Sequence, residues 1–205
     1  MQRISREPIG GCRTLQGVST NLDESDWADA VAGDGEAFCR VFDRHRDRLY
    51  RHSYRLVPSP SDADDVVAIS FFEAWRRRDS ARFVDGSILP WLLVIATNSA
   101  KNISRGTRRY RALLAKLPSG EHIRDHADDA DNEVQEALAR LSLADQQVIS
   151  LCVLDGFSER DAAHALAVAQ GTVKSRLSRA KRRLAQQLDL HSAQALSTKE
   201  ATNEL

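Results

Sequence analysis

The chain has 205 residues, 42% of them hydrophobic, and its 29 basic and 29 acidic side chains give a formal net charge of zero. This length and composition are typical of one medium or two small folded domains. No run of about eighteen apolar residues occurs, and Met1 to Gly11 lacks the apolar core of a secretory signal, so we expect a cytoplasmic protein with no segment inserted in a membrane.

Apolar residues recur at helical spacing almost throughout the chain, which predicts an all-α fold. Alternating β-branched runs are absent, and no Asn-Gly or Asp-Gly hairpin is expected. From Asp34 to Leu56 the apolar residues mark one face of a first helix, and Pro58 and Pro60 end it.

A second helix is expected from Ser61, its N-cap, to Arg78, with carboxylates in the first turn that complement the helix dipole. A loop containing Asp85 and Gly86 follows. A third helix starts near Pro90 and ends in a basic segment. These three helices form one predicted domain.

Residues 117–131 are acidic and poor in apolar side chains, as in a solvated linker. Two helices follow, the second stopped by Gly156 at its C′ position. Ser158 and Asp161 resemble a capping box for a short helix, and after a turn at residues 167–169 a last helix continues to Leu188.

We therefore predict two small helical domains joined by an acidic flexible linker. The expected parts are a flexible N-terminal extension (1–25), a first domain (26–115), the linker (116–131), a second domain (132–190) and a flexible tail (191–205).

The charges are sorted along the chain although they cancel overall. Residues 101–111 contain only basic charges, as do residues 174–183, and an acidic stretch at 121–136 separates the two. Local basic clusters of this kind suit nucleic acid even in a neutral protein.

The last two helices, with three residues between them, have the layout of a helix-turn-helix, whose second helix enters the major groove. No acidic residue occurs from Ala162 to Leu188. The alternative is a solvated basic face on a packing helix. The candidate DNA contacts, which can reach base edges or phosphates, are Thr172, Lys174, Ser175, Arg176, Arg179 and Arg183.

The third helix of the first domain carries Trp91, Asn98, Lys101 and Asn102 before its basic end. Aromatic and amide side chains beside cations suit single-stranded DNA, because bases stack on rings and the backbone follows positive charge. Taken alone, Trp91 is more often a core residue than a stacking platform, and the same holds for Phe83.

The helix from Asp62 to Arg78 is acidic at its start, apolar in its middle and basic at its end. Such a helix suits a protein partner. The equally simple alternative is dipole complementation combined with core packing.

Three segments together resemble a known family. Residues 91–102 (WLLVIATNSAKN) resemble region 2 of the extracytoplasmic-function sigma factors, and residues 62–67 (DADDVV), preceding Phe71 and Trp75, are similar to the polymerase-binding helix of that region. Residues 171–183 (GTVKSRLSRAKRR) resemble the recognition helix of region 4.

The resemblance covers roughly residues 34–112 and 133–189, in the order of the family's regions. It implies an alternative sigma factor, not an enzyme, that binds core RNA polymerase through the β′ clamp and β flap. Such a factor recognises the minus-ten and minus-thirty-five elements of promoters and helps to melt the promoter DNA. It needs no cofactor and has no small-molecule substrate.

The resemblance also implies a role for individual residues. Polymerase contact is implied for Asp62, Asp64, Asp65, Phe72 and Trp75. Minus-ten contact, including the loop that meets a flipped base, is implied for Asp85, Ser87, Trp91, Asn98, Lys101, Asn102 and Arg105. Minus-thirty-five contact is implied for the six residues of the helix-turn-helix named above.

Two positions depart from the family pattern. Ala68 and Ile69 stand where Gln-Glu is usual, so part of the polymerase contact is altered. Ala167 stands where the helix-turn-helix turn usually has glycine, and it must adopt a conformation that glycine accepts more easily.

Two other functions are compatible with parts of the sequence. A conventional helix-turn-helix regulator would act without joining polymerase, but the first domain shows no evident ligand pocket. An enzyme with a metal held by His122 and His126 near Asp125 is disfavoured, because these residues fall in the linker.

Cysteine usage excludes two kinds of structural site. Cys12, Cys39 and Cys152 are far apart, so neither a disulfide framework nor a zinc site is expected. We interpret Cys39 and Cys152 as small buried residues, with a redox role as the alternative.

Because the two predicted DNA-binding domains are linked, binding of one to a promoter raises the effective concentration of the other there. The family resemblance implies that an anti-sigma factor restrains the free protein, by covering both domains or by clamping them together.

Overall fold

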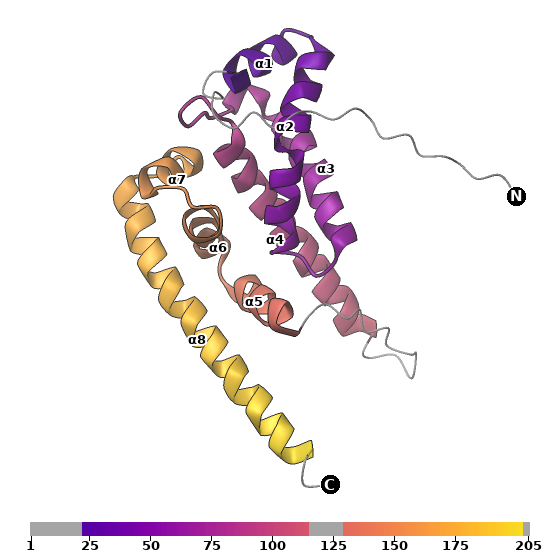
Figure 1. The fold of residues 1–205 in the computed structure, drawn as a ribbon, viewed down its shortest axis with the longest axis vertical. Helices are drawn as coiled ribbons and strands as arrows, with labels where there is room; N and C mark the ends of the chain where they lie inside the picture. Colours follow the sequence, from indigo (N-terminus) through magenta and orange to yellow (C-terminus); the bar gives the residue numbers. More distant parts are fainter. Residues whose placement is uncertain (1–21, 115–128, 203–205) are drawn as a thin grey trace, which may run out of the picture.

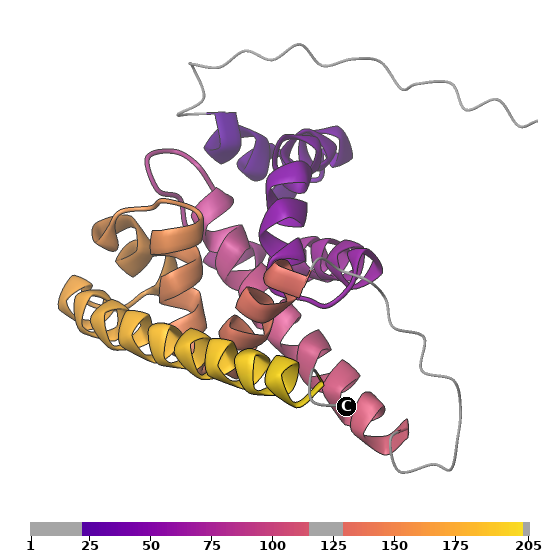
Figure 2. The ribbon, with the colours of Figure 1, turned by 60° about the horizontal axis from the view of Figure 1, so that its bottom comes forward.

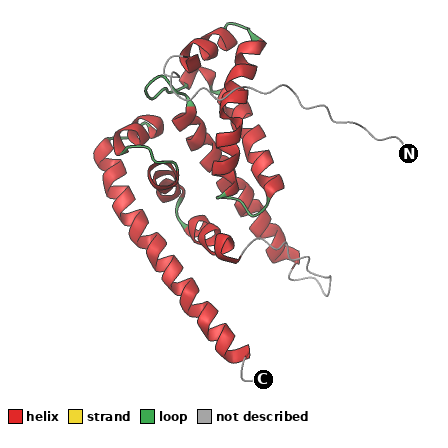
Figure 3. Ribbon diagram, viewed as in Figure 1, coloured by secondary structure: helices red, strands yellow, loops and turns green. Residues whose placement is uncertain are grey.

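The fold is described by a computed structural model over residues 22–114 and 129–202. All regular elements in that part of the chain are helical, apart from one isolated bridge between Val84 and Ser87, as the all-α prediction requires (Figures 1 and 3). The elements are α1 (Leu22–Val31), α2 (Gly35–Tyr54), α3 (Pro60–Arg76), the 3-10 turn η1 (Arg78–Ser80), α4 (Leu89–Leu114), α5 (Asp129–Arg140), α6 (Leu143–Ile149), the π-helical turn η2 (Ser150–Leu154), α7 (Glu159–Leu166) and α8 (Gln170–Thr202).

The first domain consists of α2, α3 and α4, with α1 packed on α2. Asp34 caps α2 by accepting from the amides of Glu36 and Ala37. The N-cap of α3 is Ser59, not the predicted Ser61, and Pro60 opens the helix instead of ending the preceding one. Proline is favoured at the first helical position because that residue has no intrahelical amide bond to lose.

The second domain consists of α5 to α8, and its local signals are those predicted. Gly156 has a φ of 77° just after η2. Ser158 caps α7 by accepting from the Asp161 amide at 3.2 Å and donates to the Asp161 carboxylate at 2.6 Å. Residues 167–169 separate α7 from α8, which gives the helix-turn-helix its expected three-residue turn.

The two domains pack against each other, which the sequence did not predict. Helix α4 contacts α6, α7 and η2, and one continuous hydrophobic core extends from Trp27 in α1 to Ala180 in α8. Two views show α6 and α7 beside α4, with α8 on the outer side of the second domain (Figures 1 and 2).

Four sequence expectations are corrected. A helix, α1, occupies residues 22–31, of which 22–25 were assigned to the flexible extension. Helix α8 continues to Thr202, through most of the predicted flexible tail. Cys39 is exposed and Cys152 half-buried, so neither is the buried residue that was expected. Residues Asp85 and Gly86 form a tight turn closed by one bridge, a minimal hairpin where none was expected.

Ala167 adopts the left-handed conformation inferred from the missing glycine, with φ 54° and ψ 47°. The Val168 amide donates to the Ala163 carbonyl at 3.0 Å and the Ala167 amide donates to the His164 carbonyl at 3.1 Å. These two bonds make a Schellman motif, in which a non-glycine residue at C′ is strained.

We predict that Ala167→Gly stabilises the protein by about 1 kcal/mol. Glycine relieves a strain of about 1–2 kcal/mol, but its larger loss of backbone entropy on folding offsets part of this gain. A thermal melt should show a rise of roughly 2–4 °C. Ala169→Gly is the control, since Ala169 lies in the same turn without a positive φ; it should not raise the melting temperature. An unchanged or lower value for Ala167→Gly would contradict the strain argument.

Candidate nucleic-acid interface

The first half of α8 presents a basic face to solvent. Val173 and Ala180 are buried in the second domain, whereas Lys174, Ser175 and Arg179 are exposed. The Arg179 Nε donates to the Ser175 carbonyl at 3.2 Å, and the Ser175 hydroxyl donates to the Thr172 carbonyl at 3.1 Å. The closed packing of the domains therefore leaves this face accessible.

Two predicted contacts on α8 are less free than the others. Thr172 and Arg176 are half-buried. Arg183 forms an ion pair with Asp145 of α6, although 56% of its side chain stays exposed. Arg183 therefore also holds α8 onto α6.

The predicted minus-ten residues of α4 are divided between solvent and the domain interface. Asn98 accepts a hydrogen bond from Gln147 Nε2 at 2.8 Å. Lys101 Nζ donates to the carbonyls of Ala139 and Leu141 at 2.8 and 2.6 Å. Asn102 and Arg105 are exposed. The second domain thus engages polar groups of Asn98 and Lys101, two of the residues predicted to contact minus-ten DNA.

Trp91 is a core residue in this arrangement. It is 4% exposed, and its ring lies edge-on to Trp27 with centroids 6.3 Å apart. Phe83 is half-buried against the same core. The sequence left open whether Trp91 is a core residue or a base-stacking residue, and in this structure it is a core residue.

Basic residues of the first domain cap the C-terminal ends of helices in the second. Lys101 does so at the end of α5, and Arg82 donates to the Ala165 carbonyl in the last turn of α7 at 3.1 Å. Arg48 donates to the Asp155 carbonyl just after η2, also at 3.1 Å. Helix C-termini carry unpaired carbonyls and a partial negative charge. The helix ends of the second domain therefore attract these cations as a phosphate backbone would, but more weakly.

A buried histidine and carboxylate also join the domains. His52 is fully buried in α2, and its Nδ1 lies 2.6 Å from Asp155 Oδ2, while Nε2 lies 3.0 Å from Thr97 Oγ1. Arg48 Nε lies 3.5 Å from the other Asp155 oxygen. The sequence did not predict this contact. Asp155 stands before Gly156 like an ordinary residue at a helix end, and it is 103 positions away from His52.

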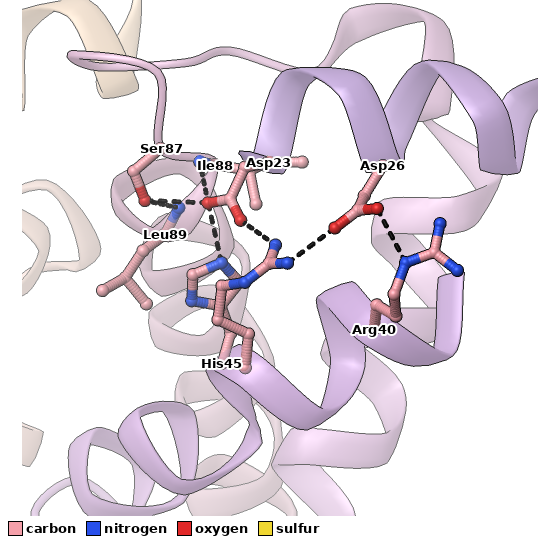
Figure 4. A network of polar contacts seen from close by, with 8 residues as sticks. Asp23, Asp26, Arg40, His45, Ser87, Ile88 and Leu89 are labelled. Atoms are coloured by element: carbon pink, nitrogen blue, oxygen red, sulfur yellow. Dashed lines mark hydrogen bonds and ion pairs between the residues drawn. The ribbon is translucent and has the colours of Figure 1, made fainter. Parts of the chain in front are cut away.

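The tight turn before α4 is held by Asp23 of α1, another residue that sequence reasoning missed. The Asp23 Oδ2 accepts from the Ser87 hydroxyl and the Ile88 amide, both at 3.0 Å, and lies 2.8 Å from His45 Nε2 (Figure 4). Arg44 donates to its other oxygen. Asp85 at the tip of the turn is exposed.

These contacts control the charge of Asp23. Burial raises the pKa of the carboxyl, but the hydrogen bond and charge of His45, the Ile88 amide and Arg44 outweigh burial and lower the pKa from 3.8 to about 2. The carboxylate is therefore ionised at neutral pH and stabilises the native state.

Helix α3 presents a mixed acidic and apolar face. Asp64, Asp65 and Ile69 are exposed, and Phe72 is 61% exposed. Trp75 is half-buried, with its ring centroid 5.3 Å from that of Phe38, and Asp62 is half-buried at the helix start. An exposed phenylalanine beside carboxylates fits a protein partner better than core packing.

Comparisons with known proteins identify the family to which the chain belongs. The family model for sigma-70 region 2 matches residues 41–110, and that for sigma-70 region 4 matches residues 131–184. The sigma factor SigM of Mycobacterium tuberculosis, of the extracytoplasmic-function (ECF) class, is 33% identical over 88% of this chain and 93% of its own length. The chain belongs to the extracytoplasmic-function group of the sigma-70 family.

Two further relatives support this assignment. The RNA polymerase sigma factor NccH of Alcaligenes xylosoxydans is 29% identical over 80% of this chain and 93% of its own length. The solved structure of CnrH in complex with the cytosolic domain of CnrY aligns with a TM-score of 0.57 and 27% identity, over 83% of this chain and 99% of CnrH. This chain is accordingly an alternative sigma factor, with α4 in its region 2 and the helix-turn-helix in its region 4.

Within residues 22–114 and 129–202, no helix is both long and apolar enough to cross a membrane. The same residues contain no group of three or more His, Cys, Asp or Glu that could hold a metal ion. His122, His126 and Cys12 lie outside the described residues.

We predict that Asp155→Ala opens this sigma factor. The substitution leaves the buried His52 Nδ1 without its hydrogen-bond partner, and an unsatisfied buried polar group costs about 1–3 kcal/mol. Small-angle scattering should show a larger radius of gyration, and backbone hydrogen exchange should increase in α4. Asp43→Ala, at an exposed position of α2, is the control. Unchanged scattering and exchange in Asp155→Ala would show that this contact does not hold the domains together.

A second prediction concerns acid stability. Because the pKa of Asp23 is lower in the native state, its stabilisation is complete above pH 4 and is lost as the pH falls toward 2. Urea unfolding of wild type and Asp23→Asn should therefore differ by an ionisation contribution of about 2 kcal/mol that disappears over this range. Asp43→Asn should show no such pH dependence. A constant Asp23→Asn difference from pH 6 to pH 2 would refute the prediction.

Proposed function

We propose that this structure is the closed form of the sigma factor, in which region 4 covers part of the minus-ten surface of region 2. The observation that carries the proposal is the engagement of Asn98 and Lys101 by Gln147 and the end of α5. Promoter opening then requires α4 to separate from the second domain.

In the proposed open form, α4 and the preceding turn bind the minus-ten element. Asn98, Lys101, Asn102 and Arg105 lie at positions i, i+3, i+4 and i+7, so they present polar groups along one side of α4. A face of amides and cations suits the single-stranded backbone and the edges of unpaired bases. Asp85 and Ser87 lie in the turn that meets the flipped base, and buried Trp91 supports the helix from within.

The helix-turn-helix binds the minus-thirty-five element. Lys174, Ser175 and Arg179 are already exposed, which supports direct contact with the major groove. Arg176 and Thr172 flank them at the groove edge, and Arg183 would exchange Asp145 for a DNA phosphate.

The α3 face binds core polymerase. Asp64, Asp65, Phe72 and Trp75 would contact the β′ clamp, with Asp62 at the edge, and the exposed Ile69 adds apolar area where the family usually has a polar residue. The second domain would meet the β flap. Figure 1 shows α3 on the side of the first domain away from α6 and α7, so this surface is available in the closed form.

An anti-sigma factor that clamps the domains together is the restraint best supported by this geometry. The domains already share one core, so a clamping partner needs to stabilise a packing that exists. The similar protein CnrH was solved in complex with the cytosolic domain of CnrY. The proposed site of action is the cytoplasm, and the proposed role is promoter recognition with no catalytic activity of its own.

A conventional regulator remains the second candidate, because the exposed α8 face could bind duplex DNA in the closed form. Such a protein would bind DNA without joining core polymerase.

The test is run-off transcription with purified core polymerase on a pool of promoter fragments. Wild type should give specific transcripts that depend on it. Lys174→Ala/Arg179→Ala and Asn98→Ala/Lys101→Ala should each lower them by at least about tenfold, since each base or phosphate contact contributes about 1–3 kcal/mol.

Arg46→Ala/Arg51→Ala is the charge-matched control for the first pair, because both arginines are exposed on α2 outside the proposed faces. It should keep transcription near the wild-type level. Binding to duplex DNA without any core-dependent transcript would favour the regulator and reject the sigma mechanism for these surfaces.

A further inference from the structure

The turn that precedes α4 needs an anchor outside itself. Asp85 and Gly86 have φ values of 48° and 77°, and the only ladder bonds are Val84 N to Ser87 O at 2.9 Å and Ser87 N to Val84 O at 3.0 Å. Asp-Gly suits a tight turn with two positive φ angles, but an isolated hairpin is marginally stable. The turn's conformation therefore depends on what holds its ends.

Asp23 holds one end through two different groups. It accepts from the Ser87 hydroxyl and from the Ile88 backbone amide at 3.0 Å each, and it is 1% exposed. The Ser87 oxygen in turn accepts from the Leu89 amide at 3.3 Å, at the first residue of α4 (Figure 4). One carboxylate thus fixes both the turn and its junction with the helix that carries Asn98 and Lys101.

The position of Asp23 is itself fixed from α2. Arg44 and His45 donate to it from the side opposite the turn. Trp27, one turn further along α1, is buried against Trp91 and donates through its Nε1 to the Arg78 carbonyl at 3.2 Å. Helix α1 is therefore held by the core independently of Asp23.

We propose that Asp23 is a positioning residue for base selection, which holds the Val84–Ile88 turn in the shape that receives the flipped minus-ten base. This rests on the proposed function. Asp23 lies outside residues 41–110, which the region 2 family model matches. The Ser87 hydroxyl donates its hydrogen bond to Asp23, so Ser87 positions the turn as well, and the exposed Asp85 and the peptide edges of the turn face the base.

Helix α1 offers a matched control for Asp23. Asp26, three residues after Asp23, pairs with Arg40 at 2.8 Å and with Arg44 at 2.6 Å. Among the described residues, the ion-pair partners of Asp26 lie on α2 and none lies in the turn. Asp26→Asn therefore weakens the α1–α2 contact while leaving the Asp23 bonds to Ser87 and Ile88 in place.

The experiment measures transcription by the full chain with core polymerase on four promoters that differ only at the flipped minus-ten base. The readout is the ratio between the best and the other bases at saturating protein. Asp23→Asn presents an amide with only one acceptor oxygen to four donors, so the ratio should fall at least about fivefold. Asp26→Asn should keep the wild-type ratio.

Ser87→Ala serves where Asp23→Asn does not fold, since it removes one bond to the turn and leaves the Asp23 contacts with α2 intact. It should also lower the ratio. The proposal is overturned if these variants keep the wild-type ratio, or if Asp26→Asn lowers it equally. No core-dependent transcript with wild type on any template would instead reject the proposed function itself.

Discussion

The structure depends on the burial of α4 from two sides. Every residue from Pro90 to Thr97 is buried, whereas an amphipathic surface helix would expose part of each turn. One side of α4 packs on α2 and α3 within the first domain, and the other on α6, α7 and η2. Separating the two domains must therefore expose apolar surface beside Asn98 and Lys101, which costs free energy.

The polar contacts across this interface have a common physical basis. Lys101, Arg82 and Arg48 each meet a carbonyl at or just after the end of a helical element in the second domain. The interaction of a cation with helix-terminal carbonyls is worth a fraction of its interaction with a phosphate chain, because the helix end carries only about half a charge. In the proposed mechanism, promoter DNA on polymerase displaces the second domain because it binds these cations more tightly than the helix ends do.

Local sequence signals account for the parts of the fold that need no distant partner. The helix-turn-helix follows from the Ser158 cap, the acid-free segment after it and the strain at Ala167, all of which act within a few residues. The exposed face of α8 follows from the spacing of Val173, Leu177 and Ala180.

Distant contacts explain what the sequence did not reveal. Helix α1 places Asp23 and Asp26 on its buried side, so hydrophobic periodicity could not mark it, and their partners lie at least 14 residues away. The interface joins His52 to Asp155 and Lys101 to the end of α5. These contacts form only when the two domains pack together, so no local sequence pattern indicates them. Predictions for Lys101 and Asn98 as DNA ligands therefore missed their second role as interface residues.

The unequal exposure of the three surfaces favours an order of assembly. The α3 face and the α8 basic face are open in the closed form, while the polar groups of Asn98 and Lys101 are occupied. With α3 as the proposed polymerase site, polymerase binds first, at no cost in domain opening. Once polymerase and the minus-thirty-five contact hold the two domains at separate places, the second domain returns to α4 less often, because its effective concentration there falls. The free energy that opens the protein then comes from polymerase and DNA together, so neither partner alone needs to be strong enough to expose the minus-ten surface.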